Sequence, residues 1–84
     1  MANEWISVKD RLPKENGDYL CYDGNNIRLL SFAKSLYSVD KYDFYNEHRS
    51  GFYDYDIELG YYEWDEVTHW MPMPEPPKEG ADNG

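Results

Sequence analysis

Carboxylates and aromatic rings are concentrated in residues 40–66, and these side chains are the best suited to chemistry or binding. The segment holds nine of the 17 acids and nine of the 15 aromatic residues, against only two bases. Carboxylates can transfer protons or bind cations, whereas carboxylates beside rigid rings suit a protein interface. The candidate partner-binding residues are Asp40, Asp43, Tyr45, Glu47, Asp54, Asp56, Glu58, Glu63, Trp64, Asp65 and Glu66.

The sequence lacks the spacings that metal sites and catalytic sites need. His48, His69 and Cys21 are the only histidines and the only thiol, and no pair of them has zinc-ligand spacing. The acids near Asp54 lack the glycine and the terminal glutamate of a calcium loop. Cys21 lies within a predicted strand, which favours a small buried side chain over a nucleophile. We therefore expect no metal, no cofactor and no enzymatic activity.

The net charge of −9 limits the possible partners. Contacts to phosphate need Lys or Arg, so direct binding of nucleic acid or of an anionic membrane is not expected. No apolar run approaches the roughly 18 residues of a membrane span, and the first residues do not resemble a secretory signal. A single cysteine fits a reducing compartment, so we expect a cytoplasmic protein.

Three interpretations of the acidic aromatic segment remain open. It could be a solvated face over a tyrosine-lined core. It could occupy the nucleic-acid site of a basic host protein, with carboxylates in place of phosphates and aromatic rings as anchors. It could also help to bind a small nucleotide, with symmetry in a homo-oligomer completing the pocket. The candidate residues for this nucleotide site are Arg11, Arg28, Arg49, Tyr42 and Tyr61.

The elements that would position these residues are mostly strands. Residues 18–22 and 27–32 flank the turn cluster 23–26 and predict a hairpin. Alternation predicts a strand at 52–57, and residues 61–64 and 67–70 also favour strand. Residues 33–48 are either a helix or a loop.

The predicted fold is α+β or mainly β, with an antiparallel sheet of about three to five strands and at most one helix. We expect one domain over residues 1–77 and a flexible tail rich in Pro and Gly over residues 78–84. Tyr53, Tyr55 and Ile57 should share one strand face, with the acids between them pointing outward. The predicted core residues are Trp5, Leu20, Tyr22, Leu29, Phe32, Tyr53, Ile57 and Trp70.

Both ends of the chain carry a signature. Residues 5–13 read WISVKDRLP and residues 67–77 read VTHWMPMPEPP. In these motifs the chain resembles a small domain common in phages and prophages, the domain of unknown function 551. The resemblance implies a phage or prophage setting and no activity. Its motif residues, which we expect to be structural, are Trp5, Arg11, Leu12, Pro13, His69, Trp70 and Pro72.

The function expected from the charge pattern and this resemblance is that of a non-enzymatic, counter-defence binding protein. Its acidic surface would mimic nucleic acid in the site of a basic host protein. One alternative is a protein that sequesters a nucleotide-type immune signal as a homo-oligomer. Another is an accessory phage domain with no inhibitory role.

Overall fold

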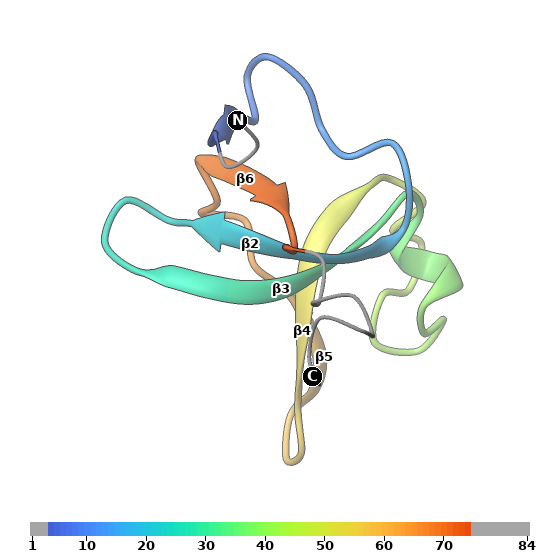
Figure 1. Ribbon diagram of the computed structural model, residues 1–84. Helices are drawn as coiled ribbons and strands as arrows, with labels where there is room; N and C mark the ends of the chain where they lie inside the picture. Colours follow the sequence, from blue (N-terminus) through green and yellow to red (C-terminus); the bar gives the residue numbers. More distant parts are fainter. Residues whose placement is uncertain (1–3, 75–84) are drawn as a thin grey trace, which may run out of the picture.

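The computed structural model describes residues 4–74, and a six-stranded antiparallel sheet dominates them (Figure 1). The strand order across the sheet is β1-β6-β2-β3-β4-β5. The strands are β1 (Ile6–Ser7), β2 (Gly17–Tyr22), β3 (Ile27–Ala33), β4 (Gly51–Asp56), β5 (Gly60–Glu63) and β6 (His69–Pro72).

The prediction of a mainly antiparallel-sheet fold is confirmed, with six strands where three to five were expected. Between residues 4 and 74 the structure contains no α-helix. The segment 33–48 forms only the single 3-10 turn Leu36–Ser38 and further turns, because its many Tyr, Asp, Ser and Asn residues are poor helix formers. The predicted domain end at residue 77 and the tail 78–84 lie outside the described residues.

The β2–β3 hairpin forms where the sequence predicts it, with Tyr22 paired to Ile27 across the turn. The Asp23 carboxylate holds this turn together. It accepts hydrogen bonds from the backbone N–H groups of Asn25 and Asn26 at 2.9 and 2.7 Å, and from Arg28 Nε at 2.9 Å. A short acid at the first turn position can satisfy the backbone in this way. The Arg28 side chain and these N–H groups lower the pKa of Asp23 from 3.8 to about 2.

The C-terminal strand β6 lies between β1 and β2, so the two ends of the described chain meet in the sheet. In the register, Trp70 lies opposite Ile6 on one side and Cys21 on the other. The Trp70 indole N–H also donates a 2.9 Å hydrogen bond to the backbone carbonyl of Arg11. This bond fixes the chain after β1, and it satisfies the one polar atom of a side chain that is otherwise buried.

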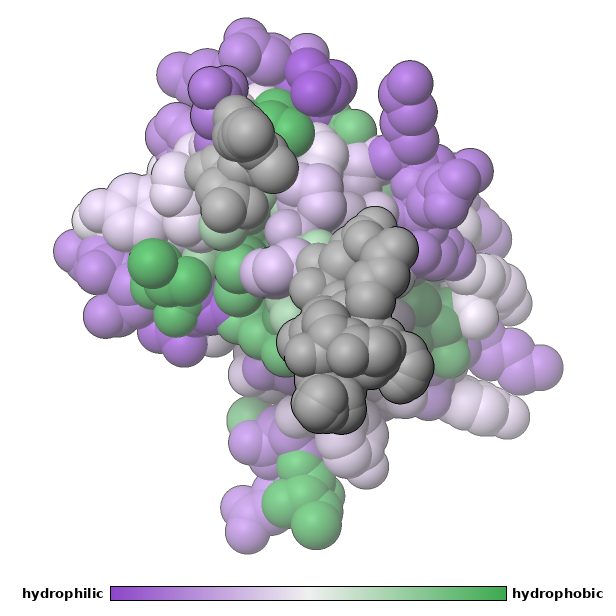
Figure 2. All heavy atoms as spheres, viewed as in Figure 1, coloured by the Kyte–Doolittle hydropathy of each residue, from purple (hydrophilic) through white to green (hydrophobic). Residues whose placement is uncertain are grey.

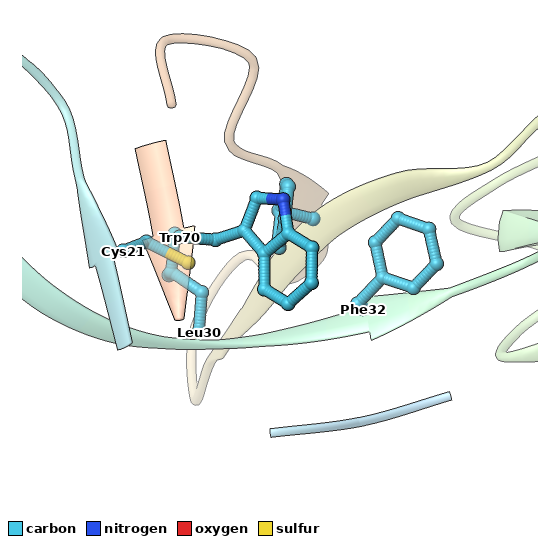
Figure 3. Close-up of a cluster of buried hydrophobic side chains, with 5 residues drawn as sticks. Cys21, Leu30, Phe32 and Trp70 are labelled. Atoms are coloured by element: carbon cyan, nitrogen blue, oxygen red, sulfur yellow. The ribbon is translucent and has the colours of Figure 1, made fainter. Parts of the chain in front are cut away.

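The main core covers one face of the sheet (Figure 3). Alternate residues of each strand point to this face, so it receives Cys21 but not Leu20, and Leu30 but not Leu29. Tyr19 packs edge-to-face on Trp70, with ring centroids 5.3 Å apart. The buried members are Cys21, Leu30, Phe32, Phe52 and Trp70.

A second, smaller core lies on the opposite face, at the end of the sheet nearest β4 and β5. Residues 34–50 fold back over this end and bury Ala33, Leu36 and Phe44. Hydrogen bonds from Leu36 N to the Arg49 carbonyl and from Tyr37 N to the Glu47 carbonyl close the segment on itself. The segment does not cover the β1 end of the same face, where Ile27 and Leu29 are exposed.

The predicted core is right in part. Phe32 and Trp70 are buried, as is Cys21, whereas Leu20 and Tyr53 are only half-buried. Trp5, Tyr22, Leu29 and Ile57 are exposed, which is a correction. β2 and β3 carry apolar residues on both faces, so the sequence could not show which face the main core uses.

We predict that Asp23→Asn lowers the free energy of unfolding at neutral pH, because the Arg28 ion pair is lost. The pKa of Asp23 is lowered on folding, so its contribution is present above about pH 3.8 and is lost as the pH falls through about 2. The difference between wild type and variant should therefore shrink over that range. Urea unfolding at a series of pH values measures this difference, and a pH-independent difference would refute the role of Asp23.

We predict that Leu36→Ala lowers the free energy of unfolding by about 2–5 kcal/mol, because Leu36 is fully buried in the second core. The matched control is Leu59→Ala, whose side chain is 76% exposed and whose loss should change stability by less than about 0.5 kcal/mol. Urea denaturation followed by tryptophan fluorescence compares the two. Equal effects would show that residues 34–50 do not close a core.

Candidate functional site

The most prominent surface element is the β4–β5 hairpin, residues 51–63, which we call the acidic hairpin. β3 pairs with β4 only from Ser31 to Ala33, so the hairpin continues beyond the sheet and projects away from it (Figure 1). It contains four acids and no Lys or Arg. Its outer half is therefore a rigid, two-stranded and negatively charged projection.

Hydrogen bonds to backbone N–H groups and a glycine with positive φ shape the outer end of the hairpin. The Asp56 carboxylate accepts hydrogen bonds from the N–H groups of Glu58 and Leu59 at 2.7 and 3.0 Å. Gly60 follows with φ 86°, a conformation that glycine adopts most readily. At this turn Ile57 and Leu59 point into solvent, and they are 88% and 76% exposed.

Residues 40–46 brace the hairpin near its outer end. The Asp43 carboxylate accepts a 3.0 Å hydrogen bond from the N–H of Tyr61. A Cβ on Gly60 would lie 2.6 Å from the same carboxylate, so this close approach also requires glycine. Phe44, Tyr53, Tyr55 and Tyr61 pack in succession, with ring centroids between 4.8 and 6.3 Å apart.

Several of the predicted partner-binding acids have local structural roles. Asp40 accepts hydrogen bonds from the N–H groups of Tyr42 and Asp43 and so forms a turn. Glu47 and Glu63 both bind Arg49, and Glu63 does so through two hydrogen bonds of 2.8 and 2.5 Å. The hydrogen bonds and charge of Glu63 raise the pKa of Arg49. These carboxylates add to the charge of the surface, but their positions serve the fold.

Seven of the nine predicted acids have no ion-pair partner between residues 4 and 74. Four of these seven, Asp54, Glu58, Asp65 and Glu66, also form no turn and no bridge to another segment. Asp54 and Glu58 lie on the acidic hairpin, and Asp65 and Glu66 directly follow it in the turn toward β6. The acidic segment thus divides into acids that hold the fold together and a free part made of these four acids. The free part is where a partner could meet unpaired carboxylates.

The two aromatic residues predicted to bind a partner, Tyr45 and Trp64, differ in their exposure. Tyr45 is 72% exposed beside the hairpin, as an interface residue would be. Trp64 instead packs against the main core and lies under Arg28, whose guanidinium carbon is 4.1 Å from the ring centroid. Its placement as an interface anchor is therefore a correction. The sequence missed Ile57 as a surface residue because strand alternation had placed it in the core.

The residues proposed for a nucleotide site do not assemble. Arg28 binds Asp23 and covers Trp64, Arg49 binds Glu63, and Tyr61 packs against the second core. Tyr42 stands apart, 83% exposed.

Arg11 alone of that set faces a sizeable hollow. This hollow, of about 630 Å³, lies beside Trp70, and Lys14 also lines it. Among the described residues neither Arg11 nor Lys14 has an ion-pair partner. A small anion could contact both cations here. The sequence analysis predicted Arg11 for such a site but not Lys14.

The motif residues at the two ends have mostly structural positions. Pro13 and Trp70 are buried, and the Arg11 carbonyl accepts the indole hydrogen bond. His69 Nδ1 lies 2.9 Å from the hydroxyl oxygen of Thr68, and its ring lies near Tyr22. Trp5 is 37% exposed and was wrongly predicted to anchor the core. Leu12 and Pro72 are exposed.

Neither a cluster of metal ligands nor a membrane-spanning helix occurs between residues 4 and 74. Between residues 4 and 74, no three His, Cys, Asp or Glu side chains are grouped as metal ligands would be. In the same part of the chain, no helix has the length and hydrophobicity of a membrane span. Burial raises the pKa of the Cys21 thiol to about 12, which makes it a poor nucleophile at neutral pH.

The fold and the surface together define a small β-sheet domain that displays an acidic hairpin. The chain belongs to the family described as "Protein of unknown function (DUF551)", whose model matches residues 4–78, so the resemblance seen in the end motifs is confirmed. It is 28% identical over 81 residues to the uncharacterized protein YfdS of Escherichia coli strain K12. That alignment covers 96% of this chain and 63% of the relative, so the chain spans less than two thirds of it. No solved structure matches significantly.

Proposed function

We propose that this chain is a non-enzymatic binding protein whose acidic hairpin docks into a basic site of another protein. The observation that carries the proposal is the end of the hairpin, where Ile57 and Leu59 are exposed beside the unpaired carboxylates of Asp54 and Glu58. Exposed apolar side chains rimmed by polar residues often mark protein-binding sites.

The charge pattern supports a basic partner. Residues 50–77 contain no Lys or Arg, and Arg49 is the base that pairs with an acid of the hairpin, so the hairpin carries a net negative charge. Such a field attracts a positive surface and speeds encounter, while Ile57 and Leu59 would supply apolar contact after docking. A site that normally binds nucleic acid is basic and elongated, and a narrow projection with carboxylates along it fits such a groove. We therefore propose a nucleic-acid-handling host protein as the partner, in a phage or prophage setting.

We predict that the double variant Asp54→Lys with Glu58→Lys loses binding to this partner by at least about tenfold, because each change replaces attraction with repulsion. The control is Asp10→Lys with Glu15→Lys, which changes the net charge equally at two exposed residues between β1 and β2, outside the acidic hairpin. The control should retain capture.

The measurement is affinity capture from a bacterial lysate by the immobilised chain, at low and high salt, with duplex DNA as competitor. The proposal expects a captured protein that salt and DNA both release, since screening acts over about 8 Å at physiological ionic strength. Capture that DNA does not displace, or that both variants lose equally, would overturn it.

A nucleotide-binding role is the second candidate, and the hollow beside Trp70 is the observation that favours it. Arg11 and Lys14 could bind phosphate there, while Ile6 and Leu12 offer apolar contact. We predict that AMP or GMP would raise the melting temperature of the wild type but not of Arg11→Gln with Lys14→Gln. The control Lys9→Gln with Lys34→Gln should respond like the wild type. No stabilisation by either nucleotide would contradict this role.

A further inference from the structure

One edge of strand β3 has backbone hydrogen-bonding groups that no described strand pairs. Tyr22 lies opposite Ile27, and its carbonyl accepts a hydrogen bond from Thr68 N, on the side of β6. Tyr22 and Ile27 are therefore a non-hydrogen-bonded pair, and the N–H and C=O of Ile27 point away from β2. The alternation of an antiparallel ladder gives the backbone groups of Leu29 the same direction. We call this outward side of residues 27–29 the free edge.

Strand β4 leaves the free edge open because it pairs with only a short part of β3. The pairing runs from Ala33 to Ser31, which lies opposite Tyr53, and the acidic hairpin then turns away from the sheet (Figure 1). Within residues 4–74 the strand order places no other strand on this side of β3. Ile27 and Leu29 thus each offer one N–H donor and one carbonyl acceptor to a further strand.

Two neighbouring strand edges are blocked by carboxylates. Where β4 has left β3, the N–H of Tyr55 bonds instead to Asp54 Oδ1 at 2.8 Å. On the outer side of β5, the N–H of Tyr61 bonds to Asp43. Natural sheets block their edges in such ways because an open edge pairs readily with another strand. The free edge has no such carboxylate among the described residues, so it is the place where this sheet can accept a strand.

One face beside the free edge is apolar. The side chains of Ile27 and Leu29 point to it and are 61% and 54% exposed, and Leu20 lies opposite Leu29 on the same face. Figure 2 shows hydrophobic side chains gathered over the β2–β3 hairpin, separate from those at the outer end of the acidic hairpin. An added strand that places apolar side chains on this face would extend the apolar surface.

The other face beside the free edge is acidic. Arg28 points to it and lies over Trp64, whose ring centroid is 4.1 Å from the guanidinium carbon. Asp65 and Glu66 directly follow Trp64 in the chain, and both are exposed. Arg28 pairs with Asp23, so it leaves these two carboxylates unpaired. Basic side chains of an added strand would complement them.

We infer that the free edge binds an extended segment of the partner protein, which adds to the sheet as an antiparallel strand and alternates apolar with basic residues. The unpaired backbone groups select a strand, because main-chain hydrogen bonds at a sheet edge need an extended backbone. The apolar face and the acidic face select the alternation, because successive side chains of a strand point to opposite faces. The inference rests on the proposed function for the basic character of the partner, and it adds a contact surface away from the tip of the hairpin.

The antiparallel direction matches every other strand pair in the sheet, and it fixes which amides of the segment bond to β3. In a hydrogen-bonded antiparallel pair, the two opposite residues exchange both N–H···O bonds and point their side chains to the same face. The residues opposite Ile27 and Leu29 are therefore the apolar ones, and the amides of the basic residues point away from β3. This geometry distinguishes a paired strand from a basic peptide that charge alone attracts.

Calorimetric titration with a capped peptide in which valine and lysine alternate tests the inference. The wild type should bind this peptide. N-methylation of the valine amides should weaken binding by at least about tenfold, because each methyl group removes a donor and blocks the edge. The matched control peptide carries its methyl groups on the lysine amides and should bind like the unmodified peptide. A peptide that alternates valine with glutamate should not bind.

Amide hydrogen exchange, followed by two-dimensional NMR, locates the added strand. In the free chain the amides of Ile27 and Leu29 should exchange fast, whereas those of Arg28 and Leu30, which point to β2, should exchange slowly. The valine–lysine peptide should slow exchange at Ile27 and Leu29 by at least about tenfold. Leu29→Pro removes one outward N–H, which an edge strand tolerates, and should lose binding. Its control, Leu29→Val, keeps the N–H and should still bind.

Failure of the valine–lysine peptide to bind would overturn the inference, as would equal weakening by the two methylated peptides. Binding that leaves Ile27 and Leu29 unprotected, or a folded Leu29→Pro variant that binds like Leu29→Val, would do the same. None of these results affects the capture of a DNA-displaceable protein by the acidic hairpin. Conversely, capture that DNA does not displace would remove the proposed function, while slowed exchange at Ile27 and Leu29 would still show strand addition.

Discussion

The structure depends on one constraint. A six-stranded sheet has two faces, and the loops of this short chain cover one face and only part of the other. The main core around Trp70 uses the first face, where residues 8–16 and 64–68 pass over it and the indole binds the Arg11 carbonyl. Residues 34–50 then cover one end of the second face. What remains uncovered is the apolar surface of β2 and β3 around Tyr22, Ile27 and Leu29, together with the hairpin that projects beyond the sheet.

The same constraint explains where many of the acids lie. Small domains with short connections need turns, and Asp23, Asp40 and Asp56 each form one by accepting backbone N–H groups. Asp43 and Glu63 join neighbouring segments. The remaining free carboxylates gather where the chain leaves the sheet, beside exposed apolar side chains. The binding surface that we propose there would use carboxylates that the fold itself does not need.

Local elements could be predicted from the sequence, and long-range placement could not. The β2–β3 hairpin follows from its turn residues, and burial of Cys21 follows from its position in a strand. The insertion of β6 between β1 and β2 joins residues more than 60 apart, which local patterns do not encode. At the candidate site, the acids were predicted, but the exposure of Ile57 was not, because strand alternation cannot show that a strand runs past the end of its sheet.

Solvent accessibility of methyl groups, measured by NMR with a soluble paramagnetic probe in dilute protein, tests this account most directly. The account predicts that the methyl groups of Leu30 and Leu36 are shielded, whereas those of Ile27, Leu29, Ile57 and Leu59 are strongly broadened. Shielding of all six residues in a monomeric sample would show that the chain covers these surfaces itself, and it would contradict the claim that the sheet leaves them available for partners.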